Sequence, residues 1–221
     1  MKQKLFSIGY MFFITLCFTS LVSAVKVIND DRIEQNQVVK VQRIVLQVLR
    51  IAPKKQVHDR DIVSLFESRI RTVDVEGVPF YIGYDEKGEK PLGYAFPVGG
   101  PGFWGPIYGM VALEPDGKKI LGLAFYKHSE TPGLGGRLTE TWFTDQFAGL
   151  PVYPIEGDKK IFALKPEGTG SAPNELDAIT GATGTSRAVE AFLNNELDRF
   201  LKNYREKLTP RMREVAQAPK S

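Results

Sequence analysis

IYGMVALEPDGKKILGLAFY, the stretch from residue 107 to residue 126, reads as two apolar strands joined by a tight turn. Ile107–Leu113 and Ile120–Tyr126 are short apolar runs with the length and composition of strands. Pro115-Asp116-Gly117 between them is a strong turn signal, because each of these residue types favours a turn backbone. We therefore expect an antiparallel hairpin here.

A second hairpin is predicted just upstream of the first. Val78–Tyr84 and Leu92–Val98 are apolar and aromatic, and the turn residues Asp85-Glu86-Lys87-Gly88 lie between them. Further short strands are expected at Pro151–Tyr153 and Ile161–Leu164.

Helices are predicted at both ends of the chain. The clearest follows Ser186, with one apolar face at helical spacing. A connector helix is expected over Asp31–Ile51, ended by Pro53, and a short helix over Arg60–Arg71. Strands in the middle and helices at the ends indicate the α+β class, as one domain with an antiparallel sheet. The face after Ser186 consists of Val189, Phe192, Leu193, Leu197, Phe200, Leu201 and Tyr204.

The composition excludes several kinds of site. A formal net charge of +3 over 221 residues, with the basic residues scattered singly, argues against a nucleic-acid partner. One cysteine, Cys17, and two histidines, His58 and His128, are too few for a disulfide or a Cys/His zinc site. Redox chemistry would therefore need a bound organic cofactor or a partner, and no metal site is expected.

The N-terminal stretch decides the compartment. Leu5–Val25 carries no charged residue, and a bilayer-spanning helix needs about 20 apolar residues. Lys2 and Lys4 precede it, so the N-terminus is expected in the cytoplasm and the remainder outside. A cleaved signal peptide is the alternative, because Val22-Ser23-Ala24 has suitable small residues, but the apolar run exceeds the usual 7–15 residues.

Two segments rich in glycine need a chemical explanation. His128–Gly136 reads HSETPGLGG and lacks the spacing of a Rossmann fingerprint or a P-loop. It is either a tight turn or a place where the backbone approaches a planar ligand. Asp177–Ser186 reads DAITGATGTS and runs into the last helix. Capping by Thr185 or Ser186 explains one hydroxyl. Small residues before a helix N-terminus also suit a phosphate, and a hydroxyl there could be esterified.

Asp177–Thr183 resembles the flavin-attachment motif of the FMN-binding domain family, in which the threonine after Gly-Ala carries FMN through a phosphoester. The segments Phe103–Gly109 (FWGPIYG) and His128–Gly136 are similar to those of the C subunits of sodium-translocating NADH:quinone oxidoreductases. The G subunits of Rnf complexes share the flavin motif and Glu130–Gly135. The resemblance covers nearly the whole chain after Asp31.

The resemblance implies covalent FMN on Thr183, attached by a flavin transferase, with the flavin ring near Thr131–Gly136. The chain would be an electron-transfer subunit of a membrane complex, with no catalytic residue of its own. Its flavin domain would lie on the periplasmic, or outer, side of the cytoplasmic (inner) membrane. Trp104 and Leu134 would cover the ring faces, and Glu130 and His128 would tune its potential. The implied cofactor-binding residues are Thr183, Asp177, Thr180, Gly181, Ala182, Thr131, Gly133, Leu134, Gly135, Trp104 and Glu130.

The expected domain boundaries follow from these assignments. Residues 1–26 would be the anchor or signal peptide and residues 27–72 the connector helices. Residues 73–209 would be the FMN-binding domain and residues 210–221 a frayed tail. Two other functions stay open, namely an exported ligand-binding module without flavin and a stand-alone exported flavoprotein.

Overall fold

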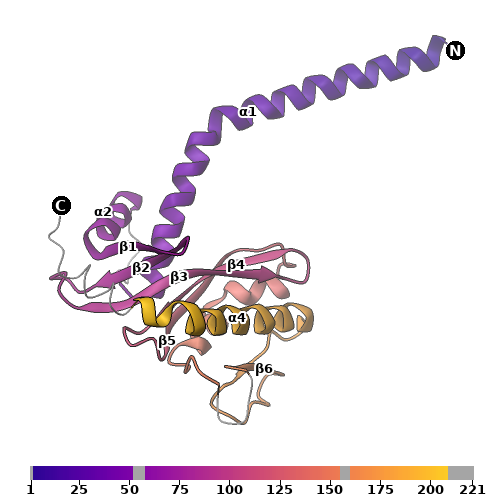
Figure 1. Cartoon of the computed structure of the whole chain (residues 1–221). Helices are drawn as coiled ribbons and strands as arrows, with labels where there is room; N and C mark the ends of the chain where they lie inside the picture. Colours follow the sequence, from indigo (N-terminus) through magenta and orange to yellow (C-terminus); the bar gives the residue numbers. More distant parts are fainter. Residues whose placement is uncertain (1, 52–57, 155–159, 209–221) are drawn as a thin grey trace. The chain divides into compact units, whose positions relative to one another are not determined.

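The computed structural model of the chain describes residues 2–51, 58–154 and 160–208, with the side chains of 2–5 and 29–35 left out (Figure 1). The chain divides into two compact units, Met1–Val41 and Gln42–Ser221. Pro53 and the predicted tail at 210–221 lie outside the described residues.

The first helix, α1 (Lys2–Val48), contains the predicted anchor and most of the predicted connector without a break. Within it, Phe6–Ile28 forms 23 helical residues with a mean hydropathy of 2.0, long and apolar enough to cross a membrane. The large apolar side chains of this segment are exposed in the first unit, as a lipid-facing helix requires.

The second unit is built on a five-stranded antiparallel sheet of sequential order β1-β2-β3-β4-β5. Both predicted hairpins are confirmed: β2 pairs with β3 and β4 pairs with β5. The sheet therefore consists of neighbouring strands joined by short turns, as the turn residues predicted. The strands are β1 (Ile70–Val75), β2 (Val78–Tyr84), β3 (Pro91–Pro101), β4 (Pro106–Leu113) and β5 (Ile120–Lys127).

The short helix predicted over Arg60–Arg71 ends earlier, because α2 spans Asp59–Arg69 and β1 begins at the next residue. Ile70 pairs with Gly83 of β2, and Val75 at the other end of β1 pairs with Val78. Alternate pairing and burial of Ile70 and Val75 hold this segment in the sheet.

The predicted strand at Pro151–Tyr153 is wrong, since only a single bridge joins Lys119 to Pro151. The strand predicted at Ile161–Leu164 is shifted to β6 (Ala163–Lys165), which pairs in parallel with β7 (Glu175–Asp177), a strand that was not predicted. Before them, the chain forms the short helices η1 (Gly135–Thr139), α3 (Thr141–Thr144) and η2 (Asp145–Phe147).

The last helix, α4 (Thr183–Asn203), starts three residues before the position predicted from its apolar face. It lies across the sheet and packs on β3 (Figure 1). Phe200 is its central contact, stacked on Phe96 with ring centroids 5.0 Å apart and also touching Phe80 and Tyr94. This apolar core, between α4 and the large side chains of the sheet, fixes where α4 begins and so positions its N-terminus.

The opposite face of the sheet carries small residues, which allow close approach of the end of α1. A Cβ built at Gly122 would lie 2.5 Å from the backbone oxygen of Val48, and one at Gly93 would lie 3.4 Å from Leu49. Ile44, Val45, Leu46, Val48 and Leu49 are buried there. The sheet is thus covered on both faces within the second unit.

Candidate functional site

Three segments that lie far apart in the sequence meet at the N-terminus of α4. The ring of Phe103 lies against Gly184, since a Cβ there would be 2.8 Å from Phe103 Cε2. The turn after β5 reaches the same place through Leu134, whose Cδ2 would lie 3.3 Å from a Cβ at Gly181. The structure therefore brings together the three segments that the sequence singled out.

Glu130 lies at the centre of this convergence. Its side chain is buried, at 4 % exposed. Oε1 accepts hydrogen bonds from the backbone N–H groups of Phe103 (2.8 Å) and Trp104 (3.0 Å), and Oε2 accepts one from Thr185 Oγ1 (2.6 Å). Its own N–H donates to His128 Nδ1 at 3.2 Å, so His128 supports the turn.

The two predicted capping residues, Thr185 and Ser186, do not cap α4. Both are buried inside its first turn. Thr185 donates to Glu130, and Ser186 Oγ accepts from the N–H of Ile179 at 3.0 Å. The N-cap position is Ala182, and no side chain of the described residues caps the helix. The first N–H groups of this 21-residue helix are therefore free to meet a phosphate.

Only one of the three threonines in the motif has an exposed hydroxyl without a hydrogen bond to the described protein. Thr180 Oγ1 donates to Glu167 Oε2 at 2.7 Å, and Thr185 is 3 % exposed and bonded to Glu130. Thr183 is exposed at the first residue of α4. Its hydroxyl is the one that a reagent from solution can reach.

Thr183 opens onto a cleft of about 600 Å³. Thr180 and Gly181 line it on one side, and Pro166 and Glu167 on the other. Arg187, four residues after Thr183 on α4, also lines the cleft and adds a positive charge. The sequence reasoning missed Glu167 and Arg187. The spacing of Thr183 and Arg187, one helical turn, was the available signal for the second.

Asp177 shapes this cleft from beneath and does not line it. Its Oδ1 accepts from the N–H of Gly168 at 2.8 Å, and its N–H donates to Gln146 Oε1 at 2.7 Å. Glu175 does similar work nearby, accepting from the N–H groups of Ser171 and Ala172. These hydrogen bonds lower the pKa of Glu175 to about 2, the Ser171 N–H making the largest contribution.

The residues expected to flank a planar ring are exposed. Trp104 is 68 % exposed and Leu134 is 45 % exposed, so neither is a core residue. Thr131 and Gly133 are also exposed, and a Cβ at Gly133 would meet no atom within 4 Å. Gly135 differs, because a Cβ there would overlap Thr185 Oγ1 and lie 2.9 Å from Glu130 Oε2.

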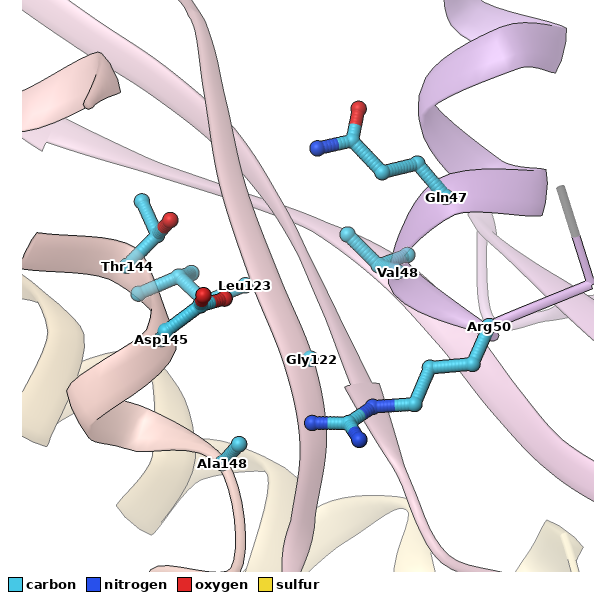
Figure 2. A pocket seen from close by; sticks show the side chains of 8 residues that line it. All are labelled: Gln47, Val48, Arg50, Gly122, Leu123, Thr144, Asp145 and Ala148. Carbon is cyan, nitrogen blue, oxygen red and sulfur yellow. The ribbon is translucent and has the colours of Figure 1, made fainter. Parts of the chain in front are cut away.

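A second cavity, of about 440 Å³, lies on the other side of β5 (Figure 2). Gln47 and Arg50 border it from the end of α1, and Thr144 and Asp145 from the η1-α3-η2 segment. None of the predicted site residues lines it. Within the described residues, no group of three or more His, Cys, Asp or Glu side chains could hold a metal ion.

Comparison with known proteins agrees with the site. Residues 102–198 match the FMN-binding domain family, and this range contains all three converging segments. The chain is 35 % identical over 115 residues to the C subunit of the Na(+)-translocating NADH-quinone reductase of Yersinia pestis, covering 50 % of this chain and 43 % of that protein. With the corresponding C subunit of Neisseria meningitidis serogroup B it shares 35 % identity over 130 residues, 55 % of this chain and 50 % of the relative.

Two solved structures share the fold. The C subunit of the Na(+)-translocating NADH-quinone reductase from Parabacteroides distasonis aligns with a TM-score of 0.65 at 24 % identity, over 76 % of this chain and 93 % of that one. NqrC from Shewanella oneidensis aligns with a TM-score of 0.67 at 22 % identity, over 77 % and 97 %. The matches to the curated relatives span about half of their length or less.

Proposed function

We propose that this chain, whose residues 102–198 match the FMN-binding domain family, carries FMN as a phosphoester on Thr183 and passes electrons within a membrane complex. The observation that carries the proposal is the difference among the three threonines of the motif. Thr183 alone offers an exposed hydroxyl without a protein partner among the described residues, at an uncapped helix N-terminus.

The residues around Thr183 suit a phosphate diester. Free N–H groups at the start of α4 and the positive end of its dipole favour a negative group there. Arg187 adds a guanidinium in the same cleft, able to form charge-assisted hydrogen bonds. In the attachment step, Thr183 Oγ1 loses its proton and bonds to phosphorus, while the leaving group of the flavin donor departs with the electrons of the broken P–O bond. A flavin transferase would supply the activated donor.

The exposed side chains on the other side of Gly181 suit a flavin ring. Trp104 and Leu134 offer apolar surfaces, and the turn at Gly133 leaves open space. When bound, FMN supplies the one-electron chemistry, and the protein contributes placement and electrostatics. Of the predicted ring contacts, Gly135 and Glu130 are taken up by each other and by Thr185, so they act from behind the exposed surface.

The test is the intact mass of the protein made together with a flavin transferase. Thr183→Val should remove the flavin mass and in-gel fluorescence, while Thr183→Ser keeps a hydroxyl and should retain both. Thr180→Val should also retain the flavin, because that hydroxyl is bonded to Glu167. Flavin that persists in Thr183→Val and disappears in Thr180→Val would refute the assignment.

The assembly follows from the same proposal. The relatives are named as subunits of a Na(+)-translocating NADH-quinone reductase, so other subunits of such a complex are the proposed partners. The α1 segment Phe6–Ile28 would be a single-pass anchor in the cytoplasmic membrane, with the flavin domain outside. Co-purification with those subunits, and NADH-driven reduction of the bound flavin, test the assembly. Co-purification with an Rnf complex, or with no other protein, would support the alternatives.

The orientation has its own measurement. A reporter that is active only outside the cytoplasm, fused after Ser221, should be active. Recovery of a soluble mature protein beginning at Val25 would instead identify the apolar run as a cleaved signal peptide.

A further inference from the structure

Glu130 is a buried carboxylate whose hydrogen-bonding capacity is used inside the protein. It accepts three hydrogen bonds, two from backbone N–H groups and one from a hydroxyl, and its side chain donates none. This is the pattern of an ionised carboxylate. Its partners lie 27, 26 and 55 residues away in the sequence, so the contacts are tertiary.

The hydrogen bonds determine which way the Phe103-Trp104 turn faces. Because both N–H groups point inward to Oε1, the two side chains are free to lie on the outer surface. Phe103 rests on Gly184, next to Thr183, and Trp104 packs edge-on against Phe103 with ring centroids 5.3 Å apart. Gly102 closes the turn, since a Cβ there would lie 2.6 Å from Glu130 Oε1.

We infer that Glu130 is a positioning residue that clamps the Phe103-Trp104 turn to the first turn of α4, with Thr185 as its anchor, and so holds Trp104 beside Thr183. A second consequence rests on the proposed function: the buried negative charge lowers the midpoint potential of a flavin on Thr183. Charge-assisted hydrogen bonds give the clamp its strength, and an unscreened negative charge disfavours adding an electron nearby.

The clamp is tested without flavin, on the full chain purified in detergent and made without a transferase. The chain has two tryptophans, so Trp142→Phe leaves Trp104 as the only one. In that background, Glu130→Ala and Thr185→Val should lower the fluorescence anisotropy of Trp104 and remove most of its near-ultraviolet circular dichroism. Glu130→Gln should retain both signals, because its amide oxygen still accepts from the two N–H groups and the Thr185 hydroxyl can turn to accept from its NH₂. Thr185→Ser should retain them as well.

The charge is tested on the flavin-loaded protein. Glu130→Gln keeps the geometry and removes the charge, so the flavin midpoint potential should shift to a more positive value. Glu167→Gln is the matched control. That carboxylate also accepts from a threonine hydroxyl of the motif but lies exposed at the cleft, so its replacement should shift the potential much less.

The outcomes separate the clamp from the proposed function. Unchanged Trp104 signals in both Glu130→Ala and Thr185→Val would overturn the clamp. If Glu130→Ala does not fold, the Thr185→Val and Thr185→Ser pair decides the question alone. An unchanged potential in Glu130→Gln would overturn the electrostatic role. A chain that never takes up flavin would refute the proposed function, while the flavin-free measurements would still decide the clamp.

Discussion

Gly133 and Gly135 lie two residues apart in one turn, yet their surroundings differ. From the sequence alone, a larger side chain at Gly135 would be expected to clash with a ligand more than with the protein. The structure reverses this, because a Cβ at Gly135 would overlap Thr185 and approach Glu130, whereas one at Gly133 meets nothing. Gly135 is therefore required by the fold, and Gly133 is the glycine exposed to a ligand.

We predict that Gly135→Ala destabilises the protein by about 1–3 kcal/mol, the usual result of overpacking a filled site. The methyl group would push Thr185 and Glu130 apart and break their hydrogen bond. Urea unfolding followed by circular dichroism measures the loss. A Gly135→Ala protein as stable as the wild type would mean that the clamp region yields easily.

Gly133→Ala tests whether the turn faces the flavin. Gly133 has φ +74° and Gly168 has φ +73°, and neither has a neighbour within 4 Å of an added Cβ, so alanine costs similar backbone strain at both. With the ring near this turn, Gly133→Ala should shift the flavin potential and slow electron transfer, and Gly168→Ala should not. Equal behaviour of the two flavin-loaded variants would show that the turn is only a connection.

At the scale of elements, the success of the sequence predictions follows the range of the interactions. The hairpins were predictable because their turns carry local signals such as Pro115-Asp116-Gly117. β1 was read as the end of a helix because no turn residue separates it from α2, and only its pairing with β2 makes it a strand. β7 has three residues and exists through pairing with β6.

The same distinction holds for the site. The motif at Asp177–Thr183 is contiguous, so its threonine could be singled out from the sequence. The role of Glu130 depends on Thr185, 55 residues away, and no local pattern reveals that contact. Likewise, the wall of the cleft is built by hydrogen bonds from Asp177 and Glu175 to loop backbone, which a sequence pattern does not show.

The segment that walls the cleft should be sensitive to acid through Glu175. Its folded-state pKa is about 2, against 4.5 for the ordinary side chain, because backbone N–H groups of Ser171 and Ala172 bind the ionised form. A lowered folded-state pKa means that the stabilisation is complete above pH 4.5 and is lost as the pH falls toward about 2. The difference in unfolding free energy between wild type and Glu175→Gln should be constant near neutral pH and shrink below pH 4.5.

Taking this difference removes the acid dependence of other groups, because both proteins share them. Asp85, whose pKa is lowered chiefly by the N–H groups of Glu89 and Lys90, is one such group. Denaturant unfolding at a series of pH values gives the result. A difference that does not vary with pH would show that Glu175 is not held by its backbone donors in solution.

At the scale of the whole molecule, the sheet divides the second unit into two packing problems. One face holds large side chains that pack on α4 and so position Thr183. The other face is lined by small residues such as Gly93 and Gly122, which leave room for the end of α1 to approach the backbone. The residues that lead away from the predicted anchor are therefore also part of the domain core.

The boundary of the folding unit can be tested on this basis. A chain that begins at Gln42 retains the buried residues Ile44–Leu49 and should fold, unfold cooperatively and accept flavin in the presence of a transferase. A chain that begins at Val73, the predicted domain boundary, lacks them and also lacks half of β1, so it exposes the apolar face opposite α4. Large buried aliphatic side chains each contribute about 1.5–3 kcal/mol, so losing several exceeds the margin of an ordinary domain. We expect the shorter chain to aggregate or to unfold without a cooperative transition, as measured by size-exclusion chromatography and thermal circular dichroism. A stable, flavin-loaded protein beginning at Val73 would show instead that the end of α1 only covers a core that is already complete.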